Sequence, residues 1–504
     1  MSDLVAVIDF GSQTTQLLAR RIREIGVYSI IIPYDSWQDI YKYDTKAVVL
    51  SGGPSSIYDK DSPTIPVEKI ELPILGICYG MQLIVHQLGG KIISDDQEYG
   101  PAHLKLIADS VFLKGTDGST VWMSHKDRVE AIPEGFKTVG ITNSIKYAAV
   151  ENNRKKIYGI QFHPEVTHTE LGKQILKNFV IDIAGASADW DIKRFISEKI
   201  SSLNRSIGGK KVLVAVSGGV DSTVTALLLK RAGADVVPVF INNGLLRYNE
   251  EKVVLGQLEK LGLSVVYEDA SELFLSKLKG VQNPEKKRKI IGHTFIDIFT
   301  KIAKRQSGIE YLAQGTLYPD VIESSVVGKN SSLIKSHHNV GGLPEKLGFK
   351  LVEPLRELFK DEVRELGRNL GIAEEYIQRQ PFPGPGLAIR IIGEITRQRL
   401  DILKKADKIL IDEIKKNGFY NKVWQSFAVL LPLRSVGVMG DHRTYDYTIC
   451  IRIVDSTDGM TADWVYLPEA VLRKISTEII NKTEGINRVV YDVSTKPPST
   501  IEWE

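Results

Sequence analysis

The chain has 504 residues, of which 43% are hydrophobic and 25% are charged, with 65 Lys and Arg against 62 Asp and Glu. This length predicts several domains, and the composition excludes the disordered and fibrous classes. A net charge of +3 is too small for the long-range field of a dedicated nucleic-acid binder, so we expect no nucleic-acid partner. Two cysteines cannot form a disulfide framework, and no apolar run is long enough to span a membrane. We therefore expect a cytoplasmic protein with no membrane partner.

The first part of the chain alternates short β-branched runs with helical patterns. The expected strands are residues 4–8, 47–50, 74–77 and 157–162. This alternation predicts an α/β layer fold. A run of small residues at 185–189 places the end of the first domain, residues 1–190, near position 190.

The strand and helix pattern then starts again. Expected strands at 212–216, 236–241, 264–267 and 311–314 predict a second doubly wound domain over residues 191–380. Three Pro and two Gly within residues 380–386 end it. A long helical pattern at 394–417 and an alternating run at 447–453 then predict a smaller C-terminal domain over 381–504. The predicted fold class is α/β, with two doubly wound α/β domains and a smaller α+β domain.

A cysteine stands at the junction of an expected strand and an expected helix. Gly76 and Gly80 flank Cys78 in the pattern G-x-C-x-G, a nucleophile elbow with sulfur in place of oxygen. The glycines give clearance to a sharp turn, and a helix N-terminus favours a thiolate. The alternative interpretation is an inert core cysteine.

A thiolate in acyl transfer needs a base, and the segment Gln161-Phe162-His163-Pro164-Glu165 offers one. Residues i and i+2 of an extended chain share a face, so Glu165 can orient the ring of His163. This predicts a Cys/His/Glu triad, against the alternative of a surface histidine beside a turn proline. The other histidines, including His337 and His338, show no reliable metal-ligand spacing.

The residues Pro-Ile-Leu-Gly-Ile-Cys-Tyr-Gly-Met-Gln at 73–82, with the downstream His-Pro-Glu, resemble the class I, triad-type glutamine amidotransferases. The resemblance implies that Cys78 attacks the side-chain amide of glutamine, that His163 is the general base and acid, that Glu165 orients it, and that ammonia leaves. It also implies an oxyanion hole formed by the N–H groups of Gly53 and Tyr79. Gln82 is expected to bind glutamine. The turn at Gly53 has a purely structural alternative.

A second motif, Ser-Gly-Gly-Val-Asp-Ser at 217–222, lies between a strand-like run and a helix expected from Thr223. Two adjacent glycines allow backbone N–H groups to wrap phosphate oxygens, and serine hydroxyls add donors. No lysine follows the glycines and the chain has no G-x-x-x-x-G-K-[ST], which excludes P-loop kinases and GTPases. The alternative is an ordinary glycine turn of an α/β protein.

The same motif resembles the phosphate loop of the N-type ATP pyrophosphatases. That family cleaves ATP between the α and β phosphates and adenylates an oxygen of its acceptor. The resemblance implies a loop that holds ATP and then pyrophosphate with magnesium, and Asp221 is the candidate that approaches the metal. The residues expected to bind are Ser217, Gly218, Gly219, Val220, Asp221, Ser222 and Thr223.

An ammonia source and an adenylating site in one chain together replace an oxygen by a nitrogen. Residues 311–320, 334–339 and 496–504 resemble the glutamine-dependent ligases that aminate xanthosine 5′-monophosphate (XMP), and the resemblance covers essentially all 504 residues. It implies adenylation of XMP at its 2-oxygen and displacement of AMP by ammonia, giving GMP, pyrophosphate and glutamate. Arg247, Lys496 and Glu502 are expected to bind XMP, and a homodimer is implied.

Three alternatives stay open at this point. The acceptor could be another molecule, such as nicotinate adenine dinucleotide, or the chain could bind nucleotides without turnover. The C-terminal tail could be a strand of a dimer interface rather than a clamp on XMP. The basic run at 286–289 follows a proline, so it is interpreted as the start of a solvated helix or a lid and not as a nucleic-acid site.

Overall fold

The computed structural model describes residues 3–320, 348–456, 459 and 461–504, apart from the side chains of residues 95–97. The sequence motif at 334–339 and the histidine pair at 337–338 lie outside the described residues. The described chain divides into two compact units between Phe195 and Ile196, within helix α4 (Ile192–Ile207). In the part of the chain that the structure describes, no helix is both long and apolar enough to cross a membrane.

The first unit is built on an eight-stranded sheet in the order β2-β1-β3-β4-β10-β9-β8-β6. The strands from β2 to β10 pair in parallel, and β9, β8 and β6 extend the sheet in antiparallel fashion. The strands in sheet order are β2 (Tyr28–Pro33), β1 (Leu4–Asp9), β3 (Thr45–Leu50), β4 (Ile74–Ile77), β10 (Ile157–Ile160), β9 (Ala149–Asn152), β8 (Lys137–Ile141) and β6 (Lys105–Leu106). Every residue of β1 and β4 is buried, as expected of parallel strands covered on both faces.

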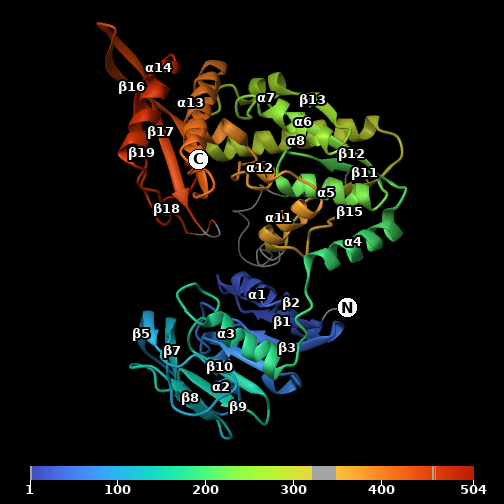
Figure 1. Cartoon of the computed structure of the whole chain (residues 1–504), viewed down its shortest axis with the longest axis vertical. Coiled ribbons are helices and arrows are strands. Elements are labelled where there is room, and N and C mark those ends of the chain that lie inside the picture. The colour runs from blue at the N-terminus through green and yellow to red at the C-terminus, as the bar shows by residue number, and fades with distance from the viewer. Residues whose placement is uncertain (1–2, 321–347, 457–458, 460) are drawn as a thin grey trace. The chain divides into compact units, whose positions relative to one another are not determined.

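Helices and a separate ribbon complete the first unit (Figure 1). The helical segments are α1 (Thr15–Glu24), η1 (Tyr34–Lys42), η2 (Val67–Lys69), α2 (Tyr79–Gln87), α3 (Gly172–Lys177) and η3 (Asn178–Ile183). The ribbon is an antiparallel pair, β5 (Lys91–His103) and β7 (Thr120–Ala131). Its strand β7 reaches the expected nucleophile, because the backbone carbonyl of Ser124 lies 3.5 Å from the sulfur of Cys78.

The second unit begins with a five-stranded parallel sheet in the order β13-β12-β11-β14-β15. Its strands are β11 (Lys211–Ala215), β12 (Asp235–Asn242), β13 (Val266–Asp269), β14 (Ile309–Ala313) and β15 (Lys350–Val352). Its helices are α5 (Val220–Arg231), α6 (Glu250–Lys260), α7 (Ser271–Leu278), α8 (Pro284–Arg305), α11 (Lys360–Asn369) and α12 (Glu374–Ile377). Since β11 lies at the centre, the loop after it opens at the carboxyl edge of the sheet, where α/β folds bind ligands.

A four-stranded mixed sheet closes the second unit. Its strands are β16 (Gln425–Met439), β17 (His442–Asp455), β18 (Asp463–Trp464) and β19 (Ile486–Tyr491). Its helical segments are η4 (Gly386–Arg390), α13 (Arg397–Lys416) and α14 (Glu469–Lys482). Strands β16 and β17 form a long antiparallel hairpin, and β17 also pairs with β18 and β19 (Figure 1). One hydrophobic cluster contains Leu213 of the parallel sheet, Leu403 of α13 and Ile451 of this sheet.

The predicted fold class is confirmed: two α/β parts are followed by an α+β part, and the first sheet has five neighbouring parallel strands while the second is parallel throughout. Most expected strands form within one to three residues of their expected ends. The boundaries at residues 190 and 380 stay predictions, because the described residues from 196 onward form one compact unit with a shared core.

Candidate active sites

Cys78 lies on a sharp turn between β4 and α2. Its backbone has φ +50° and ψ −106°, a left-handed conformation that non-glycine residues rarely adopt. A Cβ at Gly80 would lie 2.4 Å from the carbonyl oxygen of Leu50 on β3, and one at Gly76 would lie 2.6 Å from the backbone of Gly80. Only glycine fits at both positions, so the elbow is set by close packing of α2 against β3 and β4.

The structure brings the three residues of the expected triad together. Cys78, His163 and Glu165 are 5%, 8% and 1% exposed. The Nδ1 atom of His163 lies 2.7 Å from Oε1 of Glu165, and the thiol of Cys78 donates to the backbone carbonyl of Ser124 at 3.5 Å. A Cβ placed on Gly52 would lie 3.0 Å from Cε1 of His163 and 3.7 Å from Cβ of Cys78, so the Ser51–Pro54 turn passes close to both groups.

The protonation of this pair follows from burial and charge. Burial of the ring acts against protonation of His163, but the charge of Glu165 and the hydrogen bonds to Cys78 and Glu165 outweigh it, so the pKa of His163 lies well above its usual value. Burial acts to raise the pKa of Glu165, and the charge and hydrogen bonds of His163 and Thr14 hold it below its usual value. The site therefore places an imidazolium, a proton donor, beside sulfur.

Two residues that the sequence did not indicate support Glu165. The hydroxyl of Thr14 donates to Oε1 of Glu165 at 2.6 Å, and Nε of Arg21 donates to its backbone carbonyl at 3.0 Å. Thr14 directly precedes α1 and Arg21 belongs to it. One end of this helix thus fixes the carboxylate that faces His163.

The other expected residues of this site lie around the nucleophile. Gly53 packs against Tyr79, since a Cβ on it would lie 3.3 Å from Cγ of the tyrosine ring. Gln82 is buried one turn after Cys78 and donates to the carbonyl oxygen of Asp127 at 2.7 Å. Gln161, which sequence reasoning missed, lies between them: its Nε2 is 3.7 Å from the sulfur of Cys78 and its Oε1 is 3.5 Å from Nε2 of Gln82. The oxyanion and glutamine-binding roles stay predictions.

The second motif forms a compact loop between β11 and α5. Ser217 and Ser222 lie side by side, with their hydroxyls 3.3 Å apart, and the N–H of Ser217 donates to the Ser222 hydroxyl. The hydroxyl of Thr223 donates to the carbonyl of Gly219 at 2.9 Å. Gly218 has φ +79°, and a Cβ there would lie 2.4 Å from Val254. The loop thus turns sharply at Gly218 and leads directly into a helix N-terminus, a geometry that suits phosphate oxygens.

The loop in the structure is shorter than the loop that the sequence predicted. Helix α5 begins at Val220 and not at Thr223, so Val220, Asp221 and Ser222 form its first turn. The reason is local: the side chains of Ser222 and Thr223 both donate to the carbonyl of Gly219, which holds the first turn.

Asp221 lies in an ion pair with Lys360, the first residue of α11. The Nζ atom of Lys360 is 2.7 and 2.5 Å from the two carboxylate oxygens. In the described parts of the chain, no group of three or more His, Cys, Asp or Glu is placed to hold a metal ion. A magnesium ion carried by ATP needs only one or two protein carboxylates, because phosphate oxygens and water supply its other ligands. The single carboxylate of Asp221 beside the loop fits that donor set.

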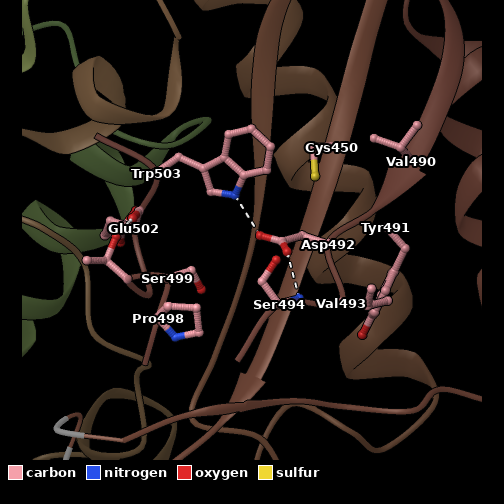
Figure 2. Close-up of a pocket in the computed structure, with 11 residues that line it drawn as sticks. Cys450, Val490, Tyr491, Asp492, Val493, Ser494, Pro498, Ser499, Glu502 and Trp503 are labelled. Atoms are coloured by element: carbon pink, nitrogen blue, oxygen red, sulfur yellow. Dashed lines mark hydrogen bonds between the residues drawn. The ribbon is translucent and has the colours of Figure 1, made fainter. Parts of the chain in front are cut away.

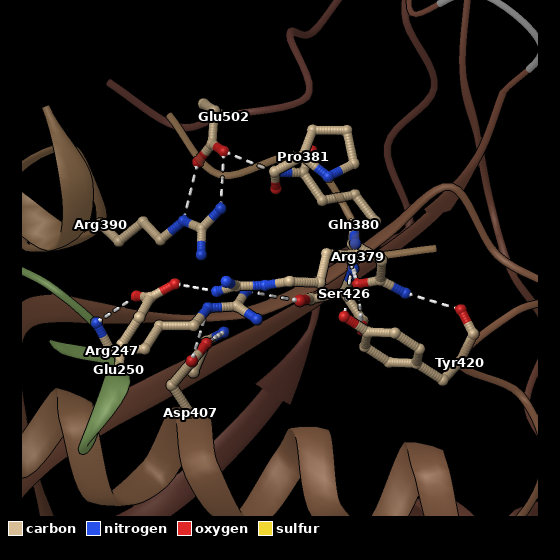
Figure 3. Close-up of polar contacts among 12 residues, drawn as sticks. Arg247, Glu250, Arg379, Gln380, Pro381, Arg390, Asp407, Tyr420, Ser426 and Glu502 are labelled. Atoms are coloured by element: carbon tan, nitrogen blue, oxygen red, sulfur yellow. Dashed lines mark hydrogen bonds and ion pairs between the residues drawn. The ribbon is translucent and has the colours of Figure 1, made fainter. Parts of the chain in front are cut away.

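The residues expected to bind XMP fall in two places. Arg247 and Glu502 belong to one polar cluster, shown in Figure 3. Arg247 donates to the carbonyl of Ser426 at 3.2 Å and pairs with Asp407 at 3.2 Å. Glu502 accepts two hydrogen bonds from Arg390 at 3.0 and 2.8 Å. Lys496 instead donates to the carbonyl of Gly459 at 2.7 Å.

Glu502 also lines a cavity of about 630 Å³ between β17, β19 and the C-terminal tail (Figure 2). Asp492 lies at its centre, where it accepts from the indole N–H of Trp503 and from the backbone N–H of Ser494, each at 2.9 Å. Burial raises the pKa of Cys450 at the cavity wall to about 12, so this second cysteine is a protonated thiol.

Three family models match separate segments of this chain. The family model described as glutamine amidotransferase class-I matches residues 6–183, the model of the tRNA methyl transferase HUP domain matches residues 210–256, and the model of the GMP synthase C terminal domain matches residues 412–503. The fold and these matches define an amidotransferase joined to an ATP-using synthetase.

Full-length relatives narrow the class to one family. Proteins named GMP synthase [glutamine-hydrolyzing] are 54% identical to this chain in Aquifex aeolicus, 53% in Thermosipho africanus and 55% in Maridesulfovibrio salexigens. Each comparison covers 99% of this chain and 99% of the relative. The chain belongs to the glutamine-hydrolysing GMP synthase family.

Proposed function

We propose that this protein makes GMP from XMP, using ATP to activate the acceptor and glutamine as the nitrogen source. The observation that carries the proposal is that one chain holds a Cys–His–Glu site and a phosphate loop, and that its relatives share this whole length. The products are GMP, AMP, pyrophosphate and glutamate. The enzyme is a ligase that forms a carbon–nitrogen bond.

In the first unit, His163 holds the proton of Cys78 as an imidazolium, and the resulting thiolate attacks the side-chain carbonyl carbon of glutamine. A bond forms between Sγ and that carbon, and the proton on His163 passes to the leaving amine so that the carbon–nitrogen bond breaks and ammonia departs. His163 then takes a proton from water, which hydrolyses the thioester to glutamate and frees Cys78. The N–H groups of Gly53 and Tyr79 hold the oxyanion of both tetrahedral intermediates, and Gln82 binds the substrate.

In the second unit, the 2-oxygen of XMP attacks the α-phosphorus of ATP, and the bond to the β-phosphate oxygen breaks. Pyrophosphate is proposed to stay on the loop formed by Ser217 to Thr223, where N–H groups at the start of α5 and serine hydroxyls would donate to its oxygens. Ammonia then attacks C2 of the adenylated base, and AMP leaves with the former 2-oxygen. Asp221 would hold a magnesium ion bound to ATP, which neutralises phosphate charge; Lys360 supplies a positive charge at the same carboxylate.

Three residues are proposed to bind XMP. Arg247 and Glu502 are supported by their shared cluster, in which a cation and a carboxylate lie close to the start of β16. Lys496 is supported only by its charge and by its position on the same C-terminal tail. A carboxylate suits the N–H groups of the base, and cations suit the phosphate.

We further propose a homodimer in the cytoplasm. The distal part of the β16–β17 hairpin exposes a run of apolar side chains, namely Leu433, Val436, Val438, Met439 and Tyr445. Exposed apolar patches of this kind mark protein interfaces, and a second copy of the chain is the proposed occupant. Two unpaired cysteines support a reducing compartment.

The test is a coupled assay with magnesium-ATP and XMP, with glutamine or ammonium in parallel, that measures GMP, AMP and pyrophosphate. We expect GMP from either nitrogen source. Cys78→Ala is expected to abolish synthesis from glutamine and to leave synthesis from ammonium, because only the first unit uses the thiol. Retained use of glutamine by this variant would refute the triad. AMP release with nicotinate adenine dinucleotide but not with XMP would overturn the acceptor.

A further inference from the structure

Arg379 lies between the phosphate loop and helix α6. Its Nη1 atom donates to the carbonyl oxygen of Gly218 at 3.1 Å. Its Nη2 atom pairs with the carboxylate of Glu250, the first residue of α6, and both side chains are labelled in Figure 3. The side chain of Arg379 is 26% exposed and that of Glu250 is 7% exposed. A charge-assisted contact of this kind, partly shielded from water, is stronger than a surface ion pair.

The contact with the carbonyl of Gly218 fixes the orientation of the whole Gly218–Gly219 peptide group. In a trans peptide the C=O and N–H groups point in opposite directions, so the carbonyl of Gly218 determines where the N–H of Gly219 points. With the carbonyl held by Arg379, that N–H turns towards Ser217, whose hydroxyl lies 3.4 Å away within the loop. Gly218 has a positive φ, and glycine has the widest choice of backbone conformations, so this peptide needs an outside contact to stay in one orientation.

The same arginine is connected to the acceptor residues. The second oxygen of Glu250 accepts from the backbone N–H of Arg247 at 2.9 Å, and Arg247 in turn contacts Ser426 at the start of β16. The next residue along the chain, Gln380, accepts from the N–H and the hydroxyl of Ser426 at 2.8 and 2.9 Å. Arg379 thus contacts the phosphate loop, and its neighbour Gln380 contacts the start of β16.

We propose that Arg379 is a positioning residue of the adenylation site, which orients the Gly218–Gly219 peptide for phosphate and links the loop to the acceptor-binding segment through Glu250 and Arg247. The proposal rests on the proposed function. Binding of XMP beside Arg247 then steadies the loop through this chain of contacts. By reciprocity, nucleotide on the loop strengthens XMP binding by the same factor.

The experiment compares Arg379→Met with the wild-type chain, using magnesium pyrophosphate as the probe in calorimetry. The variant is expected to bind pyrophosphate about tenfold more weakly, while its glutaminase activity stays unchanged. XMP is expected to tighten binding of α,β-methylene-ATP, which cannot be cleaved, in the wild type, and this effect is expected to disappear in the variant. The control is Arg368→Met, which removes an arginine with a bidentate partner, Glu374, elsewhere in the same unit.

The outcomes distinguish the positioning of the phosphate loop from its link to the acceptor-binding segment. Unchanged pyrophosphate affinity in Arg379→Met, or an equal loss in Arg368→Met, overturns the positioning role. Weakened pyrophosphate binding with the XMP effect intact overturns the link to the acceptor. If Arg379→Met does not fold, Glu250→Gln, which removes the charge and keeps the shape, is expected to show a smaller loss in the same direction. A wild-type chain that binds neither pyrophosphate nor XMP refutes the proposed function itself.

Discussion

A single carboxylate oxygen carries the orientation of the proposed catalytic base. Oε1 of Glu165 accepts from both His163 and Thr14, and it is almost completely buried. A buried acceptor that loses one of two donors gains no water in exchange, so the remaining contact changes in both strength and geometry. Thr14 is therefore expected to act on the reaction through Glu165 without touching the substrate.

Thr14→Val removes the donor and keeps the shape of the side chain. We expect glutaminase kcat to fall roughly ten- to a hundredfold, because a hydrogen bond to a charged group contributes about 1.5–3 kcal/mol. The Thr14 hydroxyl is one of the groups that lower the pKa of Glu165, so its loss raises that pKa and moves the acid limb of the pH–rate profile to higher pH. The measurement is the pH dependence of glutamate release. Thr14→Ser should restore both values, and an unshifted acid limb in Thr14→Val would contradict this role.

At this scale the sequence indicated the three residues of the proposed triad, which the structure brings together, and missed the residues that support them. Cys78 stands within a local pattern, and His163 and Glu165 are two residues apart, so periodicity alone places them. Thr14 is 151 residues from its partner Glu165, and Gln161 is 83 residues from Cys78. Those contacts depend on β10 lying beside β4, an order of strands that a single sequence does not specify.

At the scale of elements, the elbow depends on how closely α2 approaches the sheet. The backbone of Gly80 hydrogen-bonds to the carbonyl of Ser51, directly after β3, and the space for a Cβ at Gly80 is filled by Leu50. The sequence predicted this strand and helix well because the glycines and the apolar positions repeat over a short distance. It did not predict the β5–β7 ribbon, because in β7 the polar residues His125 and Asp127 occupy buried positions where a period of two leads one to expect apolar residues.

Gly80→Ala tests the elbow as a packed junction. The new methyl would lie 2.4 Å from a backbone oxygen, so α2 or β3 must move, at a cost of about 1–3 kcal/mol. We expect a lower unfolding temperature for the first unit and loss of glutaminase activity, with ammonia-dependent synthesis retained. Gly256→Ala on α6 is the matched control, because a Cβ there meets nothing within 4 Å and alanine favours a helix. Equal effects of the two substitutions would show that packing at the elbow is not the cause.

At the scale of the whole molecule, the C-terminal tail is part of the second unit's core. The sequence predicted the start of a solvated helix or a lid at 286–289. The helix is present, but Lys287 has no exposed surface. Its ammonium donates to the carbonyls of Ala388 and Ile391 and pairs with the carboxylate of Glu504. These partners lie 101, 104 and 217 residues away along the chain, so composition could not indicate this burial.

The buried pair makes the stability of the second unit depend on the last residue. Removing one partner of a buried ion pair costs about 3–5 kcal/mol when the other charge stays unpaired. Burial already lowers the pKa of Lys287, and Glu504 acts against that effect. Without Glu504 the pKa falls further, so Lys287 loses its proton more readily and part of the cost is avoided.

Glu504→Gln is therefore expected to destabilise the protein by about 2 kcal/mol near neutral pH. The sign with pH follows from Lys287: the loss is largest where the lysine and the carboxylate are both charged in the wild type, and it fades as pH rises through the lowered pKa of Lys287. Since the two units have separate cores, calorimetry should show two unfolding transitions. Glu504→Gln should lower the temperature of the second unit's transition and leave that of the first unit, which Gly80→Ala lowers, unchanged. Adding Lys287→Met should recover most of the loss, because no unpaired charge then remains buried. A shift of both transitions together would show that the units unfold as one.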